Sequence, residues 1–414
     1  MFKRSLVLAC TAGLVLAARG VAVADVEGPV WEVTSTSAPV MDATAPARPA
    51  VFPKVRAADA TTTQNEVRAT DFKTECWNKS ESRNTYGWTK SRFEQCFAGH
   101  RKVELKVKPG APTTIASVEF DYVLMAFAVD GTRRVDYTLV LENYRTLGGQ
   151  ERNIAELVIG LDGCASGGLT CTPSPMEKRA TLEGWKTDLR FSGTVTTPNG
   201  VGDGPSAIVK STLRLDLAVE SNMPNVDSWH DEGAGFSRIR FDSAGATAGK
   251  HHGAVFTDHI PTYDLMAIAD EKGTRSQVVE SARHIDDALH HAARTFPSFV
   301  GKSVPGGSFD QPLHRLVDDN LNKKNRAASG PVCRDVWGDD YDATKYNCDE
   351  YPFASTYEGA YTSTNEGKNV STWRGSARPI WHKDNQLSGN YLTSQFYTVH
   401  RVLDGDPFVV RMQL

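Results

Sequence analysis

Residues 118–127 read VEFDYVLMAF and residues 134–143 read RVDYTLVLEN, with Asp130-Gly131 in the turn between them. Their apolar residues recur with a period of two, which is typical of β-strands. Residues 186–196 (KTDLRFSGTVT) and 208–219 (IVKSTLRLDLAV) repeat the pattern, and segments containing Gly, Pro and Asn separate them. Repeated short strands with turn signals predict an all-β, sandwich-like or barrel domain over residues 71–249.

The pattern changes after about residue 250. Residues 276–296 place apolar side chains at spacings of three and four, which predicts an amphipathic helix with Ser276 as its N-cap. Residues 316–328 predict a short polar helix that ends near Gly330. Residues 396–403 and 408–412 predict two strands joined as a hairpin. We therefore expect two domains: an N-terminal all-β sandwich-like domain and a small α+β domain at residues 250–414.

The charge balance limits the classes of function. The 414 residues include 46 Lys and Arg against 50 Asp and Glu, a formal net charge of -4. This balance excludes a basic nucleic-acid coat protein that is held to phosphates by bulk charge alone. It leaves open an enzyme whose positive charge arrives as a bound metal ion.

The N-terminal residues predict export. Lys3 and Arg4 precede an apolar stretch at residues 6–18, and Ala22-Val23-Ala24 offers a cleavage site, so residues 1–24 are expected to be a signal peptide. The apolar run is too short for a membrane anchor. Residues 25–70 are rich in Ala, Pro, Thr and Val and are expected to form a flexible linker or pro-segment. We therefore expect a secreted, extracellular protein without a membrane anchor.

The cysteines agree with export. Beyond the expected signal peptide the chain has six, an even number that predicts three disulfides in an exported protein. Fifteen pairings are possible, and a zinc site is a competing interpretation. The clustering of the cysteines favours local pairs: Cys76–Cys96, Cys164–Cys171 and Cys333–Cys348.

Two adjacent carboxylates, Asp349 and Glu350, stand just before Pro352. Because proline suits the first turn of a helix, we expect both carboxylates at or before a helix N-terminus. Together with Glu358 and Asn385 they offer the oxygen ligands that a hard divalent ion takes. The alternative is that an Asp-Glu pair stabilises the helix dipole alone.

His284 lies roughly 120° from the centre of the apolar stripe of the helix expected at 276–296. A histidine in that position is either exposed to solvent or directed toward a site beside the helix.

The string CDEYPFAS at residues 348–355, followed by Glu358-Gly359, resembles the signature of the NucA/NucB family of secreted bacterial deoxyribonucleases. The resemblance extends to ESARHI at residues 280–285, to Asp384-Asn385 with Gly389, and to LDGDPF at residues 403–408. It covers roughly residues 250–414 and none of the β-rich region.

The resemblance implies a non-specific, metal-dependent endonuclease that hydrolyses DNA phosphodiester bonds. The essential aspartate of the family falls on Asp349, with Glu350 beside it, and the family's helix histidine falls on His284. With Asp349 and Glu350, Asn385 would complete a site for a divalent metal, Mg²⁺ or Mn²⁺, or for a phosphate. One departure is Asn347, where family members often carry an aspartate.

The expected substrate is DNA, and its phosphates need basic side chains. The nearest basic cluster in sequence contains Lys323, Lys324, Arg326 and Arg334, of which Arg326 and Arg334 are the candidate substrate-binding residues; a solvated surface is the alternative. Two other interpretations of the chain stay open: an extracellular binding protein whose nuclease-like domain is inactive, and a secreted toxin that acts on DNA.

Overall fold

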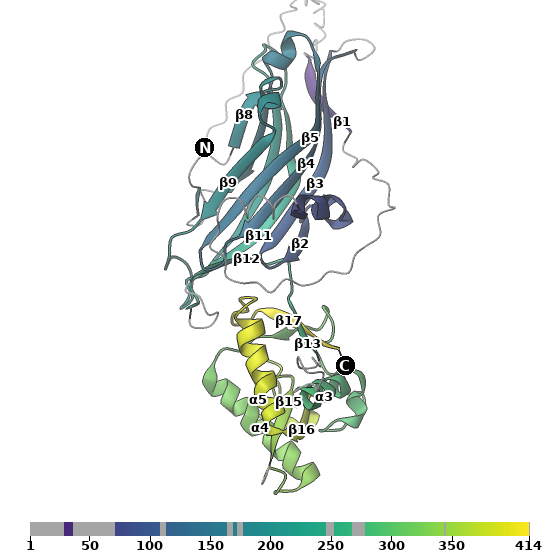
Figure 1. Ribbon diagram of the computed structural model, residues 1–414, viewed down its shortest axis with the longest axis vertical. Coiled ribbons are helices and arrows are strands. Elements are labelled where there is room, and N and C mark those ends of the chain that lie inside the picture. The colour runs from purple at the N-terminus through teal and green to yellow at the C-terminus, as the bar shows by residue number, and fades with distance from the viewer. Residues whose placement is uncertain are drawn as a thin grey trace, which may run out of the picture.

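The computed structural model describes residues 29–35, 71–107, 113–163, 169–171, 177–245, 252–266, 278–342 and 345–413. Strands dominate the N-terminal part of the molecule, and the long helices gather in the C-terminal part (Figure 1). Among the described residues, no helix is long and apolar enough to cross a membrane.

Two antiparallel sheets build the β-rich region. The first has the order β1 (Val30–Ser35), β3 (Glu94–Val107), β4 (Thr113–Ala128), β5 (Arg134–Gly148), β9 (Arg190–Thr196) and β7 (Thr170–Cys171), with β2 (Trp88–Ser91) paired to β3. The second has the order β12 (Gly253–Phe256), β11 (Trp229–Asp242), β10 (Val209–Glu220), β6 (Glu156–Asp162) and β8 (Glu177–Thr181).

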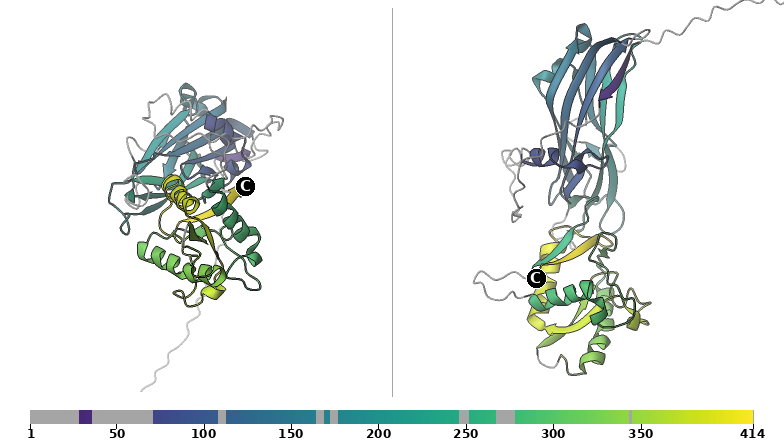
Figure 2. Two further views of the ribbon diagram at one scale, coloured as in Figure 1. Left: turned by 60° about the horizontal axis from the view of Figure 1, so that its bottom comes forward. Right: turned by 90° about the vertical axis from the view of Figure 1, so that its right-hand side faces the viewer.

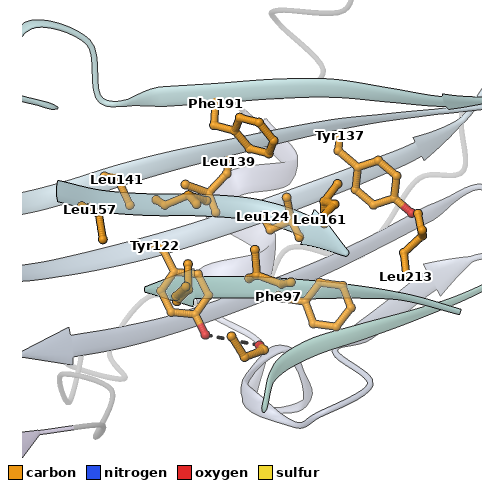
Figure 3. Packing of buried hydrophobic residues seen from close by; sticks show 14 of the residues in the cluster. Phe97, Tyr122, Leu124, Tyr137, Leu139, Leu141, Leu157, Leu161, Phe191 and Leu213 are labelled. Atoms are coloured by element: carbon orange, nitrogen blue, oxygen red, sulfur yellow. Dashed lines mark hydrogen bonds between the residues drawn. The ribbon is translucent and has the colours of Figure 1, made fainter. Parts of the chain in front are cut away.

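The two sheets share one hydrophobic core. Alternate residues of β4 and β5, such as Leu124 and Leu139, meet Leu157 of β6 and Leu213 of β10 in it (Figure 3). Burial of these side chains is what holds the sheets together, since apolar burial contributes roughly 25 cal/mol per Å². β5 shows the period-two burial that the sequence predicted. β4 is instead buried on both faces, because Val123 and Met125 pack on its other side with Phe72.

The predicted strands at 118–127, 134–143 and 208–219 are confirmed, but the strand predicted from residue 186 begins later. Residues Gly184–Thr187 form a 3₁₀ turn, and β9 starts at Arg190. Trp185 is the reason, because its ring is buried and its Nε1 donates to the Leu157 carbonyl at 2.7 Å.

The prediction of a flexible segment at residues 25–70 is wrong for residues 29–35, the part that the structure describes. β1 pairs along β3, and Trp31 is 2% exposed in the common core. The sequence offered only a short apolar alternation here, too brief to distinguish from linker. The second sheet also runs past the boundary expected after residue 249, because β12 pairs with β11.

The C-terminal region combines short strands with helices. It contains β13 (Thr262–Met266), α3 (Val279–His290), β14 (Leu313–His314), α4 (Asp319–Trp337), β15 (Tyr346–Tyr351), β16 (Ser376–Trp381), α5 (His382–Asn390), the π-helical segment η6 (Tyr391–Tyr397) and β17 (Pro407–Gln413). β13, β17 and β14 form one small sheet, and β15 and β16 form another. Two further views show the helices gathered around these strands (Figure 2).

Two predictions for this region need correction. α4 does not end near Gly330 but continues through Pro331 to Trp337, because Val332 and Cys333 pack in a small core with Trp373. Residues 396–403 do not form a strand: Phe396 lies in the helical segment η6, which ends at Tyr397, and packs against Phe408. β17 therefore pairs with β13 and β14 instead of forming the expected hairpin.

Two of the three expected disulfides are present, Cys76–Cys96 and Cys333–Cys348. The third pair cannot be followed, since Cys164 and the side chain of Cys171 lie outside the described residues, as does the expected N-cap Ser276.

Candidate active site

The antiparallel pair β15–β16 carries the candidate carboxylates. Asp349 lies opposite Arg378 and Glu350 lies opposite Ala377. Successive side chains of a strand point to opposite faces, so Asp349 faces α3 while Glu350 faces α4. The helix N-terminus expected at Pro352 is wrong: the pairing with β16 keeps both carboxylates in a strand, and turns follow it.

Each face of this pair is tied to its helix. On the α3 side, Arg378 Nη1 donates to Asp287 Oδ2 at 2.7 Å. On the α4 side, the disulfide joins Cys348 of β15 to Cys333. The strand with the carboxylates is thus fixed from both sides.

His284 of α3 is 0% exposed and reaches Asp349. Its Nδ1 lies 2.7 Å from Asp349 Oδ2, and its Nε2 lies 2.7 Å from the Ser376 hydroxyl. An ionised carboxylate can only accept, so Nδ1 donates to Asp349. Of the two alternatives for this histidine, solvent exposure is wrong, and the ring lies against Asp349 beside the helix.

Glu350 is held in an environment that favours its neutral form. Burial raises its pKa to about 8, the Asp349 carboxylate adds to the rise, and Arg326 opposes it. Arg326 Nε of α4 lies 3.9 Å from Glu350 Oε1. With no ion bound nearby, this environment favours the protonated form of Glu350 near neutral pH.

Asp384 is the residue that the sequence analysis passed over in favour of its neighbour. It is buried and accepts the backbone N–H groups of Glu280 and Ser281 at 2.9 and 3.1 Å, at the start of α3. Burial raises the pKa of Asp384, and the nearby Asp349 carboxylate adds to the rise, although the two hydrogen bonds lower it. The sequence could have pointed to Asp384, because it is a carboxylate directly before Asn385 in a segment that resembles the family. Asn385 itself is half-buried, and no hydrogen bond among the described residues joins it to Asp349 or Glu350.

The other candidate residues are more scattered. Of the predicted phosphate-binding arginines, Arg326 reaches Glu350, whereas Arg334 is exposed about 12 Å further along α4. The Glu358 carboxylate accepts hydrogen bonds from the backbone N–H and from Nδ1 of His314, at 2.9 and 2.8 Å. Glu358 thus fixes the loop after β15.

Part of the C-terminal region matches a known protein family. Residues 309–411 match the deoxyribonuclease NucA/NucB family. The matched segment contains β14, α4, β15, β16 and most of β17, and therefore both carboxylates. α3 with His284 precedes it. Searches of curated proteins and of solved structures gave no match to the chain.

The carboxylates of the matched region can be compared with the ligands that a divalent ion takes. Asp349 uses one oxygen on His284, which leaves its Oδ1 available. Asp384 uses both oxygens on backbone N–H groups. The described residues contain no ready group of three or more His, Cys, Asp or Glu ligands. This donor set fits an ion such as Mg²⁺, which takes one or two carboxylates and completes its shell with water and phosphate oxygens.

Proposed function

We propose that the protein is a secreted, metal-dependent endonuclease that hydrolyses DNA phosphodiester bonds without sequence specificity. The observation that carries this proposal is the buried contact between His284 and Asp349, beside a second carboxylate, in a region that matches a deoxyribonuclease family. We further propose that the chain divides into an N-terminal all-β sandwich-like domain and a small α+β nuclease domain. The expected signal peptide and the two disulfides support secretion.

Asp349 is the proposed metal ligand, through its Oδ1. His284 holds the carboxylate in place from the other side, and Ser376 fixes the ring of His284. A bound Mg²⁺ or Mn²⁺ would neutralise phosphate charge and activate a water molecule. Asn385 is a proposed additional ligand to the ion or to a phosphate oxygen, which requires its amide to turn toward β15.

We propose Glu350 as the proton donor in place of the metal ligand that the sequence predicted, because its burial beside Asp349 favours the protonated form and its carboxyl faces α4, away from Asp349. In the hydrolysis, the oxygen of water bonds to phosphorus as the bond to the leaving sugar oxygen breaks. The leaving oxygen takes the proton of Glu350, the proton lost by the attacking water passes to solvent, and solvent then reprotonates Glu350. Arg326 beside Glu350 is the proposed phosphate contact, and Arg334 would bind the DNA backbone further along α4.

Nicking of a supercoiled plasmid tests this function. The full chain should convert the plasmid to open circles with Mg²⁺ or Mn²⁺ and should not do so in EDTA. Cleavage that persists in EDTA would remove the metal from the proposal. Binding of DNA without cleavage under every metal condition would instead favour an inactive, nuclease-like binding protein.

A further inference from the structure

Two exposed aromatic residues face each other across the strands that carry the candidate active site. Tyr346 of β15 and Trp381 of β16 are direct partners in the register, and they are 45% and 37% exposed. Tyr351, at the other end of β15, is fully buried. The β15–β16 pair therefore has one aromatic end in the core and one at the surface.

Two lysines lie beside this exposed pair. Lys383 Nζ lies 5.6 Å from the centre of the Trp381 ring, within the range of a cation–π contact. Lys345 precedes Tyr346 and is exposed, and its carbonyl accepts the backbone N–H of His382 at 2.8 Å. Aromatic rings interleaved with cations are the surface chemistry that binds unpaired nucleotides.

The exposed pair is attached to the same helix that carries His284. The backbone N–H of Trp381 donates to Glu280 Oε2 of α3 at 2.7 Å. Glu280 and His284 lie one turn apart on α3. The distance between the aromatic pair and Asp349 is therefore fixed by this helix. Such a rigid surface loses little conformational freedom when a base stacks on it.

The spacing suits a DNA strand that passes Glu350, the proposed proton donor. Tyr346 lies four residues from Glu350 on the same face of β15, which is about 13 Å in an extended chain, whereas Asp349 points to the opposite face. A DNA strand whose leaving sugar oxygen lies at Glu350 would bring a nearby base to Tyr346 or Trp381. Bases in a duplex are already stacked and paired, and their extrusion costs free energy, so an unpaired base stacks there most readily.

We propose that Tyr346 and Trp381 form a base-stacking platform that binds single-stranded DNA next to the phosphate to be cleaved. This inference rests on the proposed function for DNA as the substrate. It adds a preference for unpaired strands, and it assigns that preference to two residues outside the proposed chemistry.

Binding to a labelled oligonucleotide tests the platform without cleavage. Fluorescence anisotropy in EDTA would give dissociation constants for a single strand and for a duplex of equal length. Tyr346→Ala/Trp381→Ala should weaken single-strand binding by about tenfold or more, because each stacked base contributes substantially. Duplex binding should change by less than about threefold, because phosphate contacts dominate it.

Two further variants keep the test decisive. Tyr346→Phe/Trp381→Phe keeps an aromatic ring at each position and should retain near-normal single-strand affinity, even if the alanine variant folds poorly. Tyr86→Ala is the matched control, since Tyr86 is 48% exposed and carries Arg238 at 4.3 Å from its ring, but lies in the β-rich region. It should leave both affinities unchanged.

Equal losses for single strand and duplex, or no loss in the alanine variant, would overturn the platform. If the unchanged protein still nicks plasmid in that case, the proposed function stands without it. If the protein neither binds nor cuts any DNA, both proposals fail together.

Discussion

Arg240 of β11 binds both carboxylate oxygens of Asp406, at 2.7 and 2.6 Å, across 166 residues of sequence. Arg92 adds a contact to the same carboxylate at 2.9 Å. Burial alone would raise the pKa of Asp406, but the two arginines outweigh it and lower that pKa. The Asp406 carbonyl in turn accepts the backbone N–H of Arg315, next to β14. The β-rich region therefore holds the loop that leads into β17.

Asp406→Asn should destabilise the protein strongly. The substitution keeps the side chain's size but removes the carboxylate that pairs with buried Arg92, and it leaves Arg240 with Asp242, which also pairs with Arg401. Breaking a buried pair costs about 3–5 kcal/mol. Urea unfolding would measure the loss. The control is Asp264→Asn, since Asp264 pairs with Arg411 at the surface, where a loss of no more than about 1 kcal/mol is expected. Equal losses for the two variants would contradict a special role for the buried contact.

The raised pKa of Glu350 predicts a pH dependence of stability. The folded protein binds this proton more tightly than the unfolded chain, whose glutamate titrates near 4.5. The unfolding free energy should therefore fall as pH rises from about 4.5 through about 8, by an amount on the order of a few kcal/mol. Glu350→Gln should lack this part of the fall. Measurements in EDTA at pH 5 and pH 8 would compare the two proteins, and parallel pH profiles would show that Glu350 is not perturbed.

His284→Gln should lower the rate of plasmid nicking by about 10–100-fold, because partners that orient a metal ligand typically contribute that much. Glutamine cannot hold Asp349 and Ser376 in the geometry of the ring. Ser376→Ala, which touches Asp349 only through His284, should have a smaller effect in the same direction. An unchanged rate in His284→Gln would show that Asp349 needs no support from α3.

Removal of the Cys333–Cys348 disulfide should destabilise the site. The bridge closes a loop of 15 residues, for which the chain-entropy model gives about 3 kcal/mol. Cys333→Ala/Cys348→Ala should therefore unfold at a lower temperature and nick plasmid more slowly. Peptide mapping should find Cys348 joined to Cys333 in the unchanged protein. A free Cys348 thiol would contradict the pairing.

Strands such as β5 and β10 were predictable because one face of each lies in the core, so burial imposes a period of two on the sequence. Trp31 was not predictable in this way. β1 is short, and its tryptophan is buried only because β3 lies beside it. The end of α4 was also missed, since Gly330 and Pro331 signal termination locally while the small core around Trp373 outweighs them.

The site was predictable in its residue types and less so in its geometry. The pair Asp349 and Glu350 was identified from the string, but Pro352 suggested a helix where pairing with β16 makes a strand. Helical periodicity correctly placed His284 off the apolar stripe. It could not supply the partners Asp349 and Ser376, which lie 65 and 92 residues away in sequence.

Nicking of supercoiled plasmid by Asp349→Asn, measured beside the unchanged protein in Mg²⁺, tests the central claim most directly. Asp340→Asn, at an exposed position after α4, serves as the control for loss of one negative charge. We predict that Asp349→Asn loses nearly all activity while Asp340→Asn keeps the normal rate. An Asp349→Asn protein that retains more than about a tenth of the normal rate, equivalent to about 1.4 kcal/mol of barrier, would contradict the assignment of Asp349 as the metal ligand.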